Sequence, residues 1–232
     1  LDDKPEDARW LTDGERRALS QQIAEEDRAK GAALHMTLRY ALTNPRVLAL
    51  CLVYFGIVCG LYSLTFWTPQ IVKAFGFSNT QTGFIAAVPF LAGALIMSRW
   101  GKHSDKTGER VWHVALPSFL GAAGLIAGAL VSEPAFALLA LTVAALGIFA
   151  ALPTFWTLPT AMLSGTAAAG AIALINSIGN TGGFAGPYVV GWLKGAGLTS
   201  GAAVAAIASV MILSGVVVLW VGDRRAPSSS PR

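Results

Sequence analysis

The stretch VLALCLVYFGIVCGLYSLTFWTPQIV, from Val47 to Val72, carries no charged side chain. A helix needs about 20 apolar residues to cross the hydrocarbon core of a bilayer, which is about 30 Å thick. Continuous runs of Leu, Val, Ala and Gly favour such helices over the alternating strands of a barrel. The sequence therefore predicts an all-α membrane protein with six transmembrane helices, and Arg99 is the single charged residue within them. The predicted helices are Val47–Val72, Gly83–Trp100, Val114–Val131, Ala135–Leu158, Ala168–Trp192 and Gly201–Val221.

The distribution of basic residues predicts the orientation of these helices. Fifteen of the 17 Lys and Arg residues lie before the first span, in the connection that follows the second (counted with Arg99 at the end of that span), or after the last. Only Lys73 and Lys194 lie in connections on the other side. The positive-inside rule therefore predicts that both termini are cytoplasmic. The excess of positive charge is then a topology signal, and we expect no binding to nucleic acid.

The polar segment of residues 1–45 is expected to form a cytoplasmic loop with surface helices. Thr12 and Glu15 have capping-box spacing, which predicts a helix over residues 13–30. A second helix, over residues 34–43, is expected to lie on the membrane surface. Asn44 and Pro45 are typical of an N-cap followed by the first helical position. The membrane domain then covers residues 46–222, and residues 223–232 are expected to form a disordered cytoplasmic tail.

Enzyme chemistry has little support in this sequence. The spans contain no Asp, Glu or His, and His35, His103 and His113 lie outside the spans and far apart. Membrane metalloenzymes need clustered His and carboxylate ligands, and a serine hydrolase needs a nucleophile next to a base. We therefore expect no cofactor and no metal. A membrane-embedded enzyme is the remote alternative.

Several polar and aromatic residues inside the spans are candidates for a substrate pathway. Tyr62, Phe66 and Gln70 recur every four residues and share one face of the first span. Asn176 and Asn180 form an i, i+4 pair in the fifth span, among several glycines. An amide in lipid is costly, so both are expected to face protein or a water-filled cavity. Trp156 in the fourth span is a further candidate. The alternative for the asparagines is hydrogen bonding between helices, and the alternative for the aromatic residues is anchoring at the membrane interface.

The connection WGKHSDKTGERVWH, from Trp100 to His113, is the most specific stretch. Gly101 and Gly108 allow tight turns between antiparallel helices. Asp105 is expected to accept hydrogen bonds at a helix N-terminus, and Lys106 and Arg110 are expected to pair with it or with a neighbouring helix C-terminus. The alternative is a basic loop that only sets the topology.

The pattern Gly101-x-x-x-Asp105-Lys106-x-Gly108-x-Arg110 resembles the signature loop of the major facilitator superfamily, although His103 stands where that loop usually has Leu. The sequence from Trp100 to His113 is similar to that of the anion:cation symporter family, which includes permeases for tartrate, phthalate, hydroxyphenylacetate and sugar acids. The stretch PEDARWL, residues 5–11, resembles that family's central loop, and AGPYVVGWL, residues 185–193, resembles its eleventh helix.

The resemblance implies that this chain is the C-terminal half of a twelve-helix bundle in a bacterial inner membrane. It also implies transport of a small organic anion, with protons, between this half and a missing N-terminal half. The loop with Gly101, Asp105, Lys106, Gly108 and Arg110 would be a cytoplasmic gate. The first residue is Leu1, which suggests a fragment. The alternative is a complete six-helix protein that dimerises into a carrier or channel.

Overall fold

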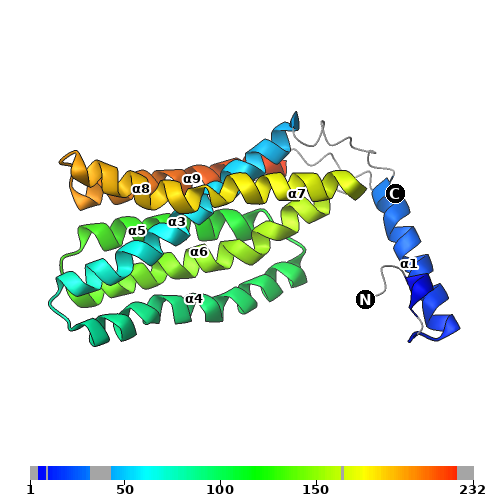
Figure 1. The fold of residues 1–232 in the computed structure, drawn as a ribbon, viewed down its shortest axis with the longest axis horizontal. Helices are drawn as coiled ribbons and strands as arrows, with labels where there is room; N and C mark the ends of the chain where they lie inside the picture. Colours follow the sequence, from blue (N-terminus) through cyan, green and yellow to red (C-terminus); the bar gives the residue numbers. More distant parts are fainter. Residues whose placement is uncertain (1–4, 9, 32–42, 163–164, 224–232) are drawn as a thin grey trace.

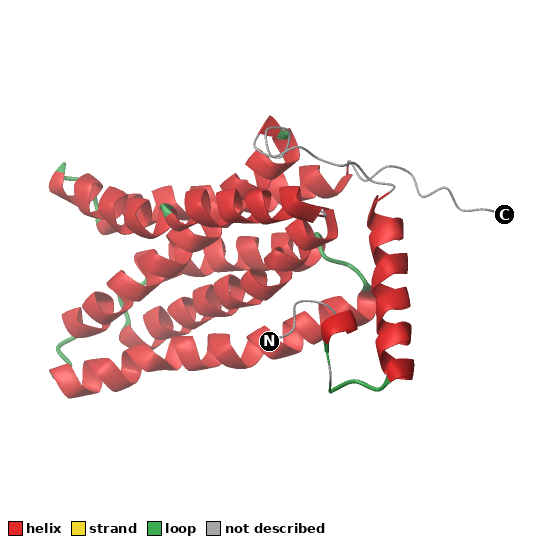
Figure 2. Ribbon diagram, turned by 45° about the vertical axis from the view of Figure 1, so that its right-hand side comes forward, coloured by secondary structure: helices red, strands yellow, loops and turns green. Residues whose placement is uncertain are grey.

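The computed structural model describes residues 5–8, 10–31, 43–162 and 165–223, and every regular element in these ranges is a helix. A short 3-10 helix, η1, and helix α1 precede the bundle (Figures 1 and 2). Seven helices then form the bundle itself. Their bounds are η1 Pro5–Asp7, α1 Asp13–Gly31, α3 Pro45–Ala74, α4 Asn79–Thr107, α5 Trp112–Leu130, α6 Pro134–Met162, α7 Gly165–Asn180, α8 Gly182–Gly195 and α9 Ser200–Asp223.

Helix α3 is at the centre of the bundle and contacts α6, α7, α8 and α9. Helix α5 packs against α6 on one side and α9 on the other, and α4 packs mainly against α6. As a result, α3 is the most buried of the long apolar helices and α4 the least. The connection between α4 and α5 lies at the same end of the bundle as α1 (Figure 1).

The predicted helix starts in the polar segment are confirmed. Helix α1 begins at Asp13, where the Glu15 carboxylate accepts from the Thr12 N–H at 3.0 Å and the Glu15 N–H donates to the Thr12 hydroxyl at 3.4 Å. Helix α3 begins at Pro45, and the Asn44 side chain accepts from the backbone N–H of Arg46 at 2.8 Å. The helix predicted over residues 34–43 and the tail predicted after residue 223 fall almost wholly outside the described residues.

Five described helices are long and apolar enough to cross a membrane: α3, α4, α5, α6 and α9. The span predicted over Ala168–Trp192 is divided into two helices, α7 and α8, which meet at Thr181. The Thr181 N–H bonds to the carbonyl of Ile178, three residues back, which is the 3-10 pattern of a tightened turn. Thr181 keeps a near-helical φ of −61° and ψ of −22°, so α8 continues from the end of α7 (Figure 1).

Helices α5 and α6 approach each other most closely at glycines. A methyl group on Gly124 would lie 2.7 Å from Cα of Ala144 and 2.8 Å from the carbonyl oxygen of Ala140. A methyl group on Gly147 would lie 2.7 Å from Cα of Gly121. These atoms belong to the backbone, so no rotation of a side chain could relieve the contact. Glycine is therefore required where these two helices meet.

This contact predicts that Gly124→Ala lowers the melting temperature of the protein in detergent. Alanine usually stabilises a helix by about 0.5–1 kcal/mol relative to glycine. Overpacking against backbone costs about 1–3 kcal/mol, and this term should dominate at Gly124. Gly191→Ala in α8 is the matched control, because a methyl group there meets no atom within 4 Å. Equal thermal shifts in the two variants would contradict the close approach.

Candidate functional site

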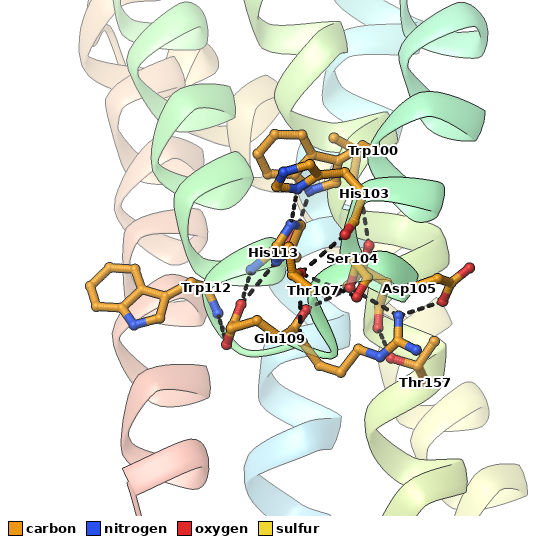
Figure 3. Close-up of polar contacts among 12 residues, drawn as sticks. Trp100, His103, Ser104, Asp105, Thr107, Glu109, Trp112, His113 and Thr157 are labelled. Carbon is orange, nitrogen blue, oxygen red and sulfur yellow. Dashed lines mark hydrogen bonds and ion pairs between the residues drawn. The ribbon is translucent and has the colours of Figure 1, made fainter.

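The connection between α4 and α5 is shorter than the sequence predicts (Figure 3). Helix α4 continues through Arg99 and Gly101 to Thr107, so the prediction of a turn at Gly101 is wrong. A methyl group on Gly101 would meet nothing within 4 Å, so no close contact requires glycine at this position of the helix. The turn forms at Gly108, which has φ 67° in the left-handed region and caps α4. The four residues from Gly108 to Val111 then lead into α5.

Asp105 and Arg110 close this turn. Arg110 Nη1 lies 2.6 Å from the Asp105 carboxylate, as the sequence predicts, and it also donates to the Ser104 hydroxyl at 3.0 Å. Ser104 is fully buried and donates in turn to the carbonyl of Glu109 at 2.6 Å. Lys106 is exposed and takes no part in this ion pair. The guanidinium of Arg110 therefore links the connection to the last turn of α4 through Ser104 and Asp105.

Glu109 caps the N-terminus of α5. Its carboxylate accepts from the N–H groups of Trp112 at 2.9 Å and His113 at 3.2 Å. The expectation that Asp105 would fill this role is wrong, because Asp105 remains within α4 and turns its carboxylate to Arg110. The N–H groups of the first turn of a helix lack partners within the helix, so a carboxylate here satisfies two of them.

The surroundings of Glu109 favour its ionised form. Burial opposes ionisation, but hydrogen bonds from the backbone of Trp112, from the ring and backbone of His113, and from the backbone of Val111 together outweigh it. The pKa of the Glu109 carboxyl is consequently below its ordinary value. The cap is therefore charged at neutral pH, where it also matches the positive end of the α5 dipole.

A chain of side-chain contacts continues from Glu109 into α4 (Figure 3). His113 Nδ1 lies 2.9 Å from the Glu109 carboxylate, and His113 Nε2 lies 2.7 Å from His103 Nδ1. The indole of Trp100 donates to the His113 carbonyl at 2.9 Å. The expectation that the histidines lie far apart is wrong for this pair. Within the described residues, however, no group of three or more His, Cys, Asp or Glu side chains is arranged to hold a metal ion.

The predicted pathway residues of α3 lie on its exposed face. Tyr62 and Phe66 are 41% and 55% exposed in this chain, and Gln70 is exposed with its amide donating to the Phe66 carbonyl at 3.2 Å. Neighbouring residues of α3, such as Ser63 and Leu64, are buried. One side of α3 therefore faces away from the core of this bundle.

Asn176 and Asn180 are both exposed near the end of α7. The Asn180 amide donates to the Asn176 side-chain oxygen at 2.7 Å and to the Asn176 backbone oxygen at 2.8 Å. The spacing of four residues accounts for this contact, because it places both amides on one face of α7. The pair satisfies some of its own hydrogen bonds and still presents polar atoms on the surface.

Tyr54 of α3, which the sequence analysis did not single out, is buried and contacts residues of α6 and α7. Its ring centroid lies 4.8 Å from that of Trp156 on α6, and its phenol also interacts with the Asn180 side chain on α7. Gly179 packs directly against the Tyr54 ring. The structure thus brings Trp156 and Asn180 together at Tyr54, while Phe66 and Gln70 lie farther along α3. The four-residue spacing of Tyr62, Phe66 and Gln70 does not point to Tyr54, because the next step back falls on Val58, which is buried.

The cap of α5 predicts that Glu109→Ala destabilises the protein, while Lys106→Ala, an exposed change in the same connection, is neutral. Loss of a side-chain cap costs about 0.5–2 kcal/mol. Because the folded-state pKa of Glu109 is lowered, its stabilisation is complete above the unfolded-state pKa of about 4.3 and is lost as the pH falls through the folded-state value. Thermal unfolding of both variants in detergent, from pH 7 down to pH 3, measures this.

The difference between the original protein and Glu109→Ala should be present at pH 7 and should shrink below about pH 4. A difference that is absent at pH 7, or that grows as the pH falls below about 4, would contradict the cap.

Comparison with known proteins adds independent evidence. The Major Facilitator Superfamily profile matches residues 8–187. A protein of Agrobacterium vitis named "Putative tartrate transporter" is 45% identical over 99% of this chain and 52% of its own length. "Inner membrane transport protein RhmT" of Escherichia coli (strain K12) is 38% identical over 92% of this chain and 51% of its own length. "Quinolone resistance transporter" of Acinetobacter baumannii is 33% identical over 84% of this chain and 45% of its own length.

This chain spans about half the length of these relatives. The three names all describe transport proteins, and they do not share a named compound. The family profile covers most of the chain and agrees with the helical bundle, the apolar spans and the Gly101–Arg110 connection. The chain therefore belongs to the major facilitator superfamily, whose members are membrane transporters, and corresponds to about half of such a protein.

Proposed function

We propose that this chain is the C-terminal half of a secondary transporter that carries a small organic anion, together with protons, by alternating access. The partner in this proposal is an N-terminal half of six helices. The observation that carries the proposal is the exposed polar and aromatic face of α3 and α7 in a chain that spans about half the length of its relatives. In a two-half transporter this face would line the central pathway.

The pathway assignment rests on the cost of polar groups in lipid. The amides of Gln70, Asn176 and Asn180 are exposed on this chain, and an exposed amide at membrane depth needs a polar environment. A water-filled pathway between two halves supplies one. Tyr62, Phe66 and Trp156 would form aromatic walls near these amides, and the amides would donate hydrogen bonds to the substrate.

The choice of an organic anion rests on the relatives whose name includes tartrate, one of which is 45% identical to this chain. The predicted spans contain no acidic residue, and their one cation, Arg99, is exposed on α4. The proton-carrying carboxylate and the cation that binds the anion would therefore belong to the N-terminal half. This division of roles leaves neutral hydrogen bonds and aromatic contacts to the half described here.

Uptake by proteoliposomes tests this function. The full two-half protein should accumulate radiolabelled tartrate when a proton gradient is imposed, and an ionophore that dissipates the gradient should abolish the accumulation. The 232-residue chain alone should show no uptake. In the two-half protein, Asn180→Ala should weaken substrate binding by about 1–3 kcal/mol, the usual cost of one lost buried hydrogen bond.

The matched control is Ser209→Ala, which removes an exposed hydroxyl of α9 that bonds only within its own helix. Saturable uptake by the chain alone would overturn the need for a second half. Normal binding by a folded Asn180→Ala protein would remove Asn180 from the pathway.

The connection formed by Gly101, Asp105, Lys106, Gly108 and Arg110 is proposed as a gate on the cytoplasmic side of a bacterial inner membrane. The excess of Lys and Arg in this connection and in the segment before α3 supports the orientation, since both lie at one end of the bundle (Figure 1). The Asp105–Arg110 pair would act as a latch that opens when the cytoplasmic face opens. It lies at the end of the bundle, away from the pathway residues of α3, so it would not bind substrate.

Asp105→Asn should therefore slow transport and favour the inward-open form without changing which anions compete. A Lys106→Cys reporter measures this in whole cells and inverted vesicles, because Lys106 is exposed beside the latch. A membrane-impermeant maleimide should label the cysteine only in inverted vesicles, and faster when Asp105 is replaced. Labelling in whole cells would overturn the orientation, and a normal transport rate for Asp105→Asn would overturn the latch.

A further inference from the structure

Three polar atoms of α3 are buried without a hydrogen-bond partner, and the three residues that carry them line one small cavity. They are the Ser63 hydroxyl, the Trp67 indole N–H and the Thr68 hydroxyl. Ser63 is 5% exposed and Thr68 is fully buried. An unsatisfied buried group costs about 1–3 kcal/mol, and the cost is higher in a bilayer, where no bulk water can compensate. Three such groups around one space indicate that a polar occupant belongs there.

The cavity has the size of one water molecule. Its volume is about 20 Å³, and a buried water needs about 10–15 Å³ and two to four polar partners. Ser63, Trp67 and Thr68 supply three partners. The remaining lining is apolar, from Leu125, Leu141 and Ile207 among others, so the polar atoms have no other role in this part of the core.

A larger pocket shares walls with this cavity and extends to the end of the bundle that lies opposite Gly108. Its volume is about 310 Å³, at the lower end of the range of about 300–1,000 Å³ that is typical of ligand pockets. It lies among the ends of α3, α5 and α8 and the first turns of α9. The walls common to both spaces include Trp67, Ile71, Val190 and Val204. Trp67 is thus a wall of both the larger space, called the upper pocket from here on, and the small cavity.

The charge of the upper pocket is positive. Lys194 Nζ lies 4.4 Å from the centroid of the Trp67 ring, in a cation–π contact that fixes the ammonium at the pocket. No acidic side chain lines the pocket, and among the described residues no salt bridge includes Lys194. Gln70 is the other polar side chain of the lining, and its amide donates to the Phe66 carbonyl. The pocket thus combines one cation with mainly apolar walls.

The upper pocket meets the proposed substrate pathway at one residue, Gln70, and otherwise lies apart from it. The small cavity next to it lies on the buried side of α3, with Ser63 and Thr68, whereas Tyr62 and Phe66 lie on the exposed side. The walls of the upper pocket come from α3, α5, α8 and α9 of this chain and from Phe75 and Val131, which directly follow α3 and α5. The pocket is therefore complete without a second half.

We infer that this pocket is a second binding site, which takes a small organic anion with a compact apolar body above one fixed water molecule. Lys194 binds the anionic group in a charge-assisted hydrogen bond, and Ile71, Val190 and Val204 enclose the apolar body. The water accepts from the Trp67 N–H and bonds to the hydroxyls of Ser63 and Thr68. A neutral molecule of the same shape lacks the contact with Lys194 and binds more weakly.

Calorimetry on the purified protein in nanodiscs tests the upper site. The probe is cyclohexanecarboxylate, which has one carboxylate on a compact apolar ring, and cyclohexanecarboxamide is its neutral counterpart. Saturable binding of the acid is expected, with weaker binding of the amide. Lys194→Gln should weaken binding of the acid about tenfold or more, which corresponds to loss of a charge-assisted bond.

Lys73→Gln is the matched control, because Lys73 lies at the same end of the bundle and bonds to the Phe77 carbonyl and the Asn79 side chain. Lys73→Gln and Asn180→Ala should both leave binding of the acid unchanged. Unchanged binding in Lys194→Gln, or no saturable binding by the folded protein, would overturn the site. Loss of binding in Asn180→Ala would assign the probe to the substrate pathway and also overturn it.

Thr68→Val tests the water, because valine has the shape of threonine without its hydroxyl. If the hydroxyl bonds to a water, its loss should lower the melting temperature or leave it unchanged. If the cavity is dry, removal of an unpartnered hydroxyl should raise the melting temperature, and that result would overturn the water in the small cavity.

Discussion

The close approach of α5 and α6 at Gly124 and Gly147 is the contact on which the rest of the bundle depends. Lipid tails are as apolar as the helices, so burial of apolar surface does not hold two helices together in a bilayer. Their association depends on dispersion contacts, which fall off steeply when a gap of even half an ångström opens. Glycine brings the two backbones into direct contact. Because α4 packs on α6 and α9 packs on α5, this pair positions both outer helices.

The same principle builds the candidate pathway on the other side of the bundle. Gly179, Gly182 and Gly186 of α7 and α8 pack against α3, where a methyl group would meet the Tyr54 ring or the backbone near Cys59. This packing places Asn180 beside Tyr54 and Trp156, although the three residues come from three different helices. The polar surface of α7 is therefore oriented by small residues that carry no chemistry themselves.

Polar groups are satisfied in two different ways along this chain. At the helix ends, local side chains supply the missing partners, as Glu109 does for the N–H groups of Trp112 and His113. In the core beside α8 and α9, Ser63 and Thr68 find no partner in the protein. The contrast separates polar residues that complete the fold from polar residues that require an occupant. We therefore propose an occupant for the small cavity and the upper pocket beside Trp67, and a latch for the α4–α5 connection.

The sequence alone determined the helical class, the positions of the apolar spans and the starts of α1 and α3, because length, hydropathy and capping are local properties. It also contained the pattern by which the chain resembles its family. The tertiary structure alone decided that α4 runs through Gly101, that Glu109 caps α5 in place of Asp105, and that His103 meets His113. Each of these depends on the residue at which a helix ends, and a shift of a few residues there changes which side chain reaches a given N–H group. Periodicity likewise placed Tyr62, Phe66 and Gln70 on one face of a helix. Which neighbouring helix packs against that face depends on contacts between distant segments of the chain, and no local pattern contains that information.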